Sequence, residues 1–195
     1  AAGKLVIVEE ATGTWCGFCP RGAVALAFLE RDYHGLAQGI AVHNGDPMVL
    51  APYDDGIGTL ISGYPSAVVQ RNADIDPSAI FPPVNAALEL APTALLSNGA
   101  QYDGTTDSLH VSLKTKFLAG ANSNWKVACV LIEDDVTGTS SGYAQSNYYA
   151  SGNYGDLIRP DGTNWVNMII VGVDSNLATA TCLASYGFYF HGTVL

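Results

Sequence analysis

Cys16 and Cys19 are the residues of this chain whose type and spacing best suit chemistry, in the run Cys16-Gly17-Phe18-Cys19. A strand-like stretch comes directly before them, and an Ala- and Leu-rich stretch typical of a helix follows. At the start of a helix, unpaired N–H groups and the macrodipole stabilise a thiolate. The spacing also brings both sulfurs within bonding range on one helix turn. It therefore predicts a reversible dithiol, in which the Cys16 thiolate attacks a disulfide and Cys19 resolves the mixed disulfide.

A zinc site and a purely structural disulfide are the alternatives for this pair. Structural zinc needs four ligands, and the other cysteines, Cys129 and Cys182, lie far apart and do not form a second such pair. His34 and His43 are too widely spaced to close a zinc finger. We therefore expect no metal and no cofactor, while the structural disulfide stays open as an alternative.

The residues around the cysteines predict a strand–helix–strand unit. Residues 4–10 are a continuous β-branched run, typical of a strand buried on both faces in a parallel sheet. Residues 21–31 predict a largely buried helix that ends near Gly35, and Pro20 fits the first turn, where its missing N–H is not needed. Residues 39–43 predict the second strand, closed by a turn.

The stretch that follows predicts one more strand and one more helix. Residues 48–62 are ambiguous, because a proline and two glycines interrupt any helix there. Residues 66–71 predict a third strand. Asp76-Pro77 then predicts the start of a helix to about residue 91, interrupted at Pro82-Pro83.

From Pro92 onward the pattern changes to short alternating runs separated by Gly, Asn, Ser and Asp. Residues 109–113, 125–132 and 165–173 predict strands, and the polar residues 138–164 predict a long loop. This pattern favours an all-β sandwich of immunoglobulin type. We therefore predict an α/β domain over residues 1–91 and a β-sandwich domain over residues 92–195.

Two motifs in the first domain resemble the thioredoxin family. Trp15-Cys16-Gly17-Phe18-Cys19 after a strand resembles the thioredoxin active site, and Gly63-Tyr64-Pro65-Ser66 resembles the place of its cis-proline. More narrowly, residues 10–22, residues 42–47 and the strand from Pro65 resemble the twenty-eight-kilodalton outer-membrane-protein family, thioredoxin-like lipoproteins of bacterial envelopes. The resemblance covers about residues 4–75 and implies a thioredoxin-like first domain; members of the family often carry a β-sandwich after it.

The resemblance implies roles for several residues around the cysteines. Pro65, with a cis peptide bond, would hold the partner's backbone and keep metal out. Glu10, six residues before Cys16, stands where thioredoxins keep a buried acid that relays a proton to the second cysteine; a strand-end carboxylate in solvent is the open alternative. Phe18 replaces the proline usual between thioredoxin's cysteines, so its redox potential does not carry over.

Four further residues are candidates on their types and positions. Trp15, Phe18 and Tyr64 are the predicted substrate-binding residues, Trp15 and Phe18 as an apolar platform for a partner's disulfide, although Trp15 suits a packing role equally. His43 ends the second strand on the side where a parallel sheet places its site, but a polar cap on that strand is the favoured interpretation.

Composition restricts the partners and the location. The 195 residues are 13% charged with a formal net charge of −10, which argues against a nucleic-acid partner. The richness in Gly, Tyr, Ser, Thr and Asn is typical of extracytoplasmic proteins. No apolar run is long enough for a membrane span. Since the chain begins abruptly at Ala1, attachment to a membrane through a removed N-terminal anchor is consistent with the resemblance.

The function predicted from these features is that of a thiol-disulfide oxidoreductase of the bacterial cell envelope, in the periplasm or at the outer membrane surface. Its partners would be protein thiols or disulfides. The alternative is a non-catalytic surface binding module that uses the thioredoxin fold as a scaffold. We expect Cys129, on one face with Trp125 and Leu131, to point into the sandwich core, and we favour free thiols at Cys129 and Cys182 over a disulfide between them.

Overall fold

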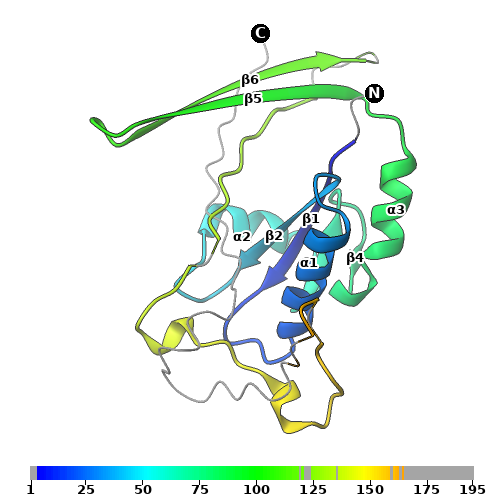
Figure 1. Cartoon of the computed structure of the whole chain (residues 1–195), viewed down its shortest axis with the longest axis vertical. Helices are drawn as coiled ribbons and strands as arrows, with labels where there is room; N and C mark the ends of the chain where they lie inside the picture. Colours follow the sequence, from blue (N-terminus) through cyan, green and yellow to red (C-terminus); the bar gives the residue numbers. More distant parts are fainter. Residues whose placement is uncertain are drawn as a thin grey trace.

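The chain folds into an α/β unit and a separate β-hairpin in the computed structural model (Figure 1), which describes residues 4–118, 120, 124–134, 136–158, 160–162 and 164. The elements of the α/β unit are β1 (Val6–Thr12), α1 (Pro20–Asp32), β2 (Ala37–His43), α2 (Ala51–Gly58), β3 (Ser66–Val69), β4 (Asp74–Ile75), a 3-10 turn (Pro77–Ala79) and α3 (Phe81–Glu89). This is a thioredoxin-like βαβαββ core. The thioredoxin-like fold was predicted, whereas strand β4 was not.

The sheet of this unit has the strand order β2-β1-β3-β4. β1 runs parallel to β2 and antiparallel to β3, so β1 is a central strand of a mixed sheet. Because a central strand is covered on both faces, its continuous apolar sequence is explained. The loop that carries the two cysteines follows the carboxyl end of β1. Because β1 is an inner strand, this loop begins near the middle of the sheet.

Helices cover both faces of the sheet. Val6 and Val8 of β1 pack in one core cluster with residues of α1 and with Val84 of α3. On the opposite face, Ala11 packs in a second cluster with Ile57 of α2. The alternation of β1 therefore places Glu10 on the side of α1.

Helix α2 resolves the ambiguity at residues 48–62. Pro52 lies in the first turn of α2, where no N–H is required. Tyr53 and Ile57, four residues apart on one face, are buried against the sheet. This burial favours the helix although it contains Gly56 and ends at Gly58.

A hairpin of β5 (Ala94–Asp103) and β6 (Ser108–Phe117) follows the α/β unit. Register and alternation give it one apolar and one polar face. The apolar face carries Ala94, Leu96, Ala100, Tyr102, Leu109, Val111, Leu113 and Phe117. Among the described residues no second sheet packs on this face, so the hairpin is shown but the immunoglobulin-like sandwich is not.

The prediction of a strand at residues 125–132 is wrong. A single-residue bridge occurs in this stretch at Val127, and another follows it at Glu133. Val130 and Ile132 pack against the core cluster on the α2 side of the sheet, whereas Trp125 and Leu131 are exposed. The run is apolar at both odd and even positions, so its sequence did not determine which side would be buried.

Cys129 in this stretch is half-buried and is a free cysteine, as favoured from the sequence. The described residues contain no sandwich core, so the predicted orientation of Cys129 into such a core is not shown. Cys182 and the strand predicted at residues 165–173 lie outside the described residues.

The loop predicted at residues 138–164 returns to the α/β unit. It contains two short 3-10 helices, Ser141–Tyr143 and Tyr148–Ser151. Figure 1 shows this yellow segment beside the loop that leaves β1. No helix in the described part of the chain is long and apolar enough to cross a membrane.

Candidate active site

Cys16 and Cys19 form a disulfide at the start of α1, with their Cα atoms 5.3 Å apart. Cys19 is the residue that precedes the helix, and Pro20 is its first residue. Both cysteines are buried, Cys16 at 5% exposure and Cys19 at 1%. The predicted placement of the pair, after a buried strand and at the start of a helix, is therefore confirmed.

Pro65 lies at the same edge of the sheet as the disulfide. Its peptide bond with Tyr64 is cis, as predicted. Ser66 pairs with Ala11 of β1, so Pro65 comes level with the end of that strand, where the chain turns towards Cys16. Pro65 itself is buried.

Trp15 and Tyr64 form an aromatic pair beside the cysteines. Their ring centroids are 5.3 Å apart in an edge-to-face arrangement. Trp15 is 50% exposed, and its indole N–H donates to the backbone oxygen of Asn44 at 2.7 Å. Trp15 thus presents an open apolar face in a fixed orientation, as a substrate-binding residue requires.

Glu10 is a buried carboxyl group on the α1 side of the sheet, and its alternative as a solvent-facing residue is excluded by its 1% exposure. Burial raises the pKa of Glu10 to about 8, although a hydrogen bond from Thr12 and the charge of Arg21 act in the opposite direction. Its Oε1 atom has no hydrogen-bond partner. The group therefore can be neutral or charged near neutral pH, which suits proton transfer.

Gly22 brings helix α1 against this carboxyl group. A Cβ atom at Gly22 would collide with Glu10 Oε1. Gly22 lies three residues after Cys19, and residues at that spacing are neighbours on a helix surface. Glu10 is thereby packed against the helix turn that carries the second cysteine.

Asp46 fixes the loop between β1 and Cys16. Its carboxylate accepts hydrogen bonds from the backbone N–H of Thr14 and of Met48, both at 2.9 Å, and contacts His43 Nδ1 at 2.7 Å. Burial would raise the pKa of Asp46, but these bonds outweigh it and lower the pKa. His43 is buried and bonded to Asp46, so it holds the loop in addition to ending β2.

Residues 141–154, which we call the strap, donate hydrogen bonds to backbone carbonyl groups of residues 13–17, which we call the cysteine loop. Gln145 Nε2 donates to the oxygens of Cys16 at 2.9 Å and Gly13 at 3.3 Å. The N–H of Ser146 donates to the oxygen of Thr14 at 2.6 Å, and the N–H of Tyr148 donates to that of Gly17 at 2.9 Å. The strap thus forms one wall of the site.

Phe18 is covered by the strap and is not part of an open platform with Trp15. Its ring is edge-to-face with Tyr148, Tyr149 and Tyr154, at centroid distances of 5.0, 6.2 and 5.0 Å. Arg21 lies over the same ring at 5.7 Å. The predicted platform is therefore divided: Trp15 packs on Tyr64, and Phe18 packs among the tyrosines of the strap.

The sequence did not single out Asp46, Gln145 or Tyr148. Asp46 follows the carboxyl end of a predicted strand, which is a usable signal. Residues 138–164 were interpreted by their polarity, but they contain a cluster of tyrosines, and aromatic rings of that size need packing partners. Within the described residues, no three His, Cys, Asp or Glu side chains gather as a metal site.

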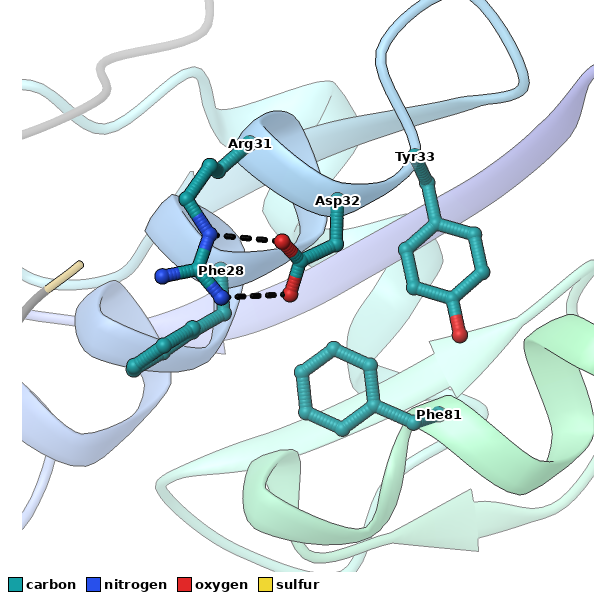
Figure 2. A pocket seen from close by; sticks show the side chains of 5 residues that line it. All are labelled: Phe28, Arg31, Asp32, Tyr33 and Phe81. Atoms are coloured by element: carbon teal, nitrogen blue, oxygen red, sulfur yellow. Dashed lines mark hydrogen bonds and ion pairs between the residues drawn. The ribbon is translucent and has the colours of Figure 1, made fainter.

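An open hollow of about 640 Å³ lies at the far end of α1 (Figure 2). It is lined by Phe28, Arg31, Asp32, Tyr33 and Phe81. Figure 2 shows the charged groups turned towards each other, and Arg31 binds Asp32 through two hydrogen bonds of 2.6 and 2.7 Å. The hollow lies at the end of α1 opposite to the cysteines and is separate from the disulfide site.

Comparison with known proteins gives a likeness of fold. No family model and no curated protein matches the chain. Among solved structures, HBP35 of Porphyromonas gingivalis is 17% identical with a TM-score of 0.52, over 100% of this chain and 65% of that one. A structural-genomics protein from Agrobacterium tumefaciens is 16% identical with a TM-score of 0.42, over 53% of this chain and 55% of that one. This chain therefore spans less than two thirds of the length of either protein.

Proposed function

We propose that the protein is a thiol-disulfide oxidoreductase that exchanges disulfides with protein partners. The observation that carries the proposal is the Cys16–Cys19 disulfide at the start of α1, on the same sheet edge as the cis peptide bond before Pro65. A purely structural disulfide would not require a buried acid packed against the helix that follows it, and Glu10, which lies against Gly22 of that helix, is such an acid. The combination supports exchange chemistry.

Electrons move in two steps in the proposed reaction. In the reduced protein, the Cys16 thiolate attacks one sulfur of a partner disulfide, forms a mixed disulfide and releases the other partner sulfur as a thiolate. Cys19 then loses its proton, with Glu10 as acceptor, and its thiolate attacks Cys16 Sγ. The Cys16–Cys19 disulfide forms, and the second partner sulfur leaves. The partner gains the two electrons that the dithiol loses, and each step is reversible.

The other site residues would hold the partner. Trp15 and Tyr64 offer an apolar surface next to Cys16, and Pro65 lies at the sheet edge where the partner's backbone would pass. Pro65 would also occupy the space in which a metal ligand would otherwise approach the sulfurs.

The location and the family are also proposals. The sequence motifs support membership of the twenty-eight-kilodalton outer-membrane-protein family and a site of action in the bacterial envelope, in the periplasm or at the outer membrane surface. An N-terminal anchor would attach the protein to the membrane. An oxidising compartment would permit the disulfide to persist.

The hairpin supports the proposal of an immunoglobulin-like sandwich. A two-stranded hairpin is marginally stable alone, and an apolar face needs cover. The face that includes Leu113 is the one that the proposed sandwich would cover.

An insulin-reduction assay tests the enzymatic proposal. With dithiothreitol as electron donor, the full chain should accelerate precipitation of reduced insulin, and the Cys16→Ser variant should lose the acceleration. A Cys129→Ser variant is the matched control, since Cys129 is free and lies outside the site. Equal rates for the full chain and its Cys16→Ser variant would remove the enzymatic function and leave the binding module.

A further inference from the structure

The strap encloses the cysteine loop on one side only. Four backbone oxygens of that loop, those of residues 13, 14, 16 and 17, accept hydrogen bonds from strap donors. In return, Thr14 Oγ1 donates to the oxygen of Gly142 at 2.7 Å. Together these five hydrogen bonds, two of them from Gln145, hold the strap against residues 13–17 of the loop.

The ring of Tyr148 completes this wall. A Cβ atom at Gly17 would collide with the Tyr148 ring, so the ring lies directly on the first of the two residues between the cysteines. Phe18 and Arg21 also hold the strap: the Phe18 ring packs on Tyr148, and Arg21 donates to the Tyr149 hydroxyl at 3.3 Å. The strap is therefore packed as well as hydrogen-bonded.

The opposite side of Cys16 has no such wall among the described residues. There, half of the Trp15 surface is exposed, and Tyr64 packs against it before the buried Pro65. Cys16 itself is only 5% exposed. The side of Cys16 that carries the half-exposed Trp15 is therefore the side on which a partner sulfur would approach.

We propose that the strap is a specificity wall, with Gln145 and Tyr148 as its determinants, that admits disulfides in extended or unfolded peptide segments and rejects those on compact protein surfaces. This rests on the proposed function, since it names the substrate class of the same site. A single extended peptide segment can lie along Trp15 and Tyr64. A disulfide held on a rigid, broad surface meets the strap before its sulfur reaches Cys16.

The test measures how fast Cys16 in the reduced protein reacts with two maleimides of different size. One is N-ethylmaleimide, and the other is a maleimide joined by a short linker to a compact folded protein, which presents a rigid, broad surface; labelling is followed by mass spectrometry as loss of the unmodified Cys16 peptide. Gln145→Ala and Tyr148→Ala should each speed the large reagent by about threefold to tenfold, the effect of one hydrogen bond or ring contact. The small reagent should change less than twofold.

Matched controls come from the exposed hairpin. Gln101→Ala and Tyr102→Ala remove the same side chains at positions away from the site and should leave both rates unchanged. Tyr148→Phe keeps the ring and should behave as the natural chain. Should Tyr148→Ala fail to fold, as judged by near-ultraviolet circular dichroism, Gln145→Ala carries the test.

The outcomes separate this inference from the proposed function. Unchanged labelling by the large reagent in both strap variants, or equal acceleration of both reagents, would overturn the specificity wall whatever the insulin assay shows. Selective acceleration of the large reagent supports the wall. Absence of Cys16-dependent insulin reduction, with that selective acceleration present, would overturn the enzymatic function and leave the wall in place.

Discussion

Glu10 couples its protonation to the stability of the fold. Its pKa is about 8 in the folded chain against a normal value of 4.5, so the folded state retains a proton that the unfolded state releases between these values. The stability gained from the neutral carboxyl group is complete below about pH 4.5. It falls as the pH rises and is lost above about pH 8.

Glu10→Gln should therefore raise the free energy of unfolding at pH 8 by a few kcal/mol and should flatten its decline between pH 4.5 and 8. Urea unfolding at several pH values measures this. Glu9→Gln is the matched control: Glu9 is equally buried but binds Arg71, so its substitution should destabilise the fold. A Glu10→Gln variant with the natural pH dependence would refute the burial argument.

The two cysteines should differ in reactivity once reduced. Cys16 lies three residues before Cys19 and is 5% exposed, whereas Cys19, the residue directly before the helix, is only 1% exposed. At neutral pH, iodoacetamide should modify Cys16 several times faster than Cys19, as read from peptide masses over time. Faster modification of Cys19 would reverse the two roles.

Helix α1 depends on one glycine for its approach to the sheet. Gly22→Ala should destabilise the fold by about 2 kcal/mol, because the added methyl group collides with the buried Glu10 side chain. Gly56→Ala in helix α2 meets nothing within 4 Å and should stabilise by about 0.5–1 kcal/mol through helix propensity. Thermal unfolding followed by circular dichroism compares the two. Equal effects would show that α1 does not press on Glu10.

Elements with a regular local pattern were predictable from the sequence. The apolar run of β1, the helix start at Pro20 and the alternation in β6 each agree with the structure. Helix α2 was hidden by its glycines, because tertiary burial of Tyr53 and Ile57 outweighs weak helix propensity.

At the scale of the molecule, the hairpin has an apolar face that the proposed sandwich would bury. Leu113 is 43% exposed among the described residues, and the proposed sandwich would bury it, so Leu113→Asp should lower the free energy of unfolding by about 3 kcal/mol through lost apolar burial and an added charge. Ser112→Asp, next to it on the polar face, should change it by less than about 0.5 kcal/mol. Chemical denaturation monitored by tryptophan fluorescence compares them, and equal effects would count against a covered face.

Long-range contacts explain what the sequence left open. The bond between Thr14 and Gly142 joins positions 128 residues apart, and no local period encodes such a pairing. The cysteine pair, Pro65 and Glu10 were predictable because each lies in or near a short motif that resembles the thioredoxin family. The strap was missed because its residues acquire their role only when the chain returns to the sheet edge.

Trapping the mixed disulfide tests the central claim most directly. In a Cys19→Ser variant that also carries Cys129→Ser, the intermediate with a peptide disulfide cannot be resolved. The account predicts a covalent adduct through Cys16, seen by mass spectrometry and released by dithiothreitol. Absence of the adduct, with Cys16 still open to iodoacetamide, would contradict thiol-disulfide exchange at this site.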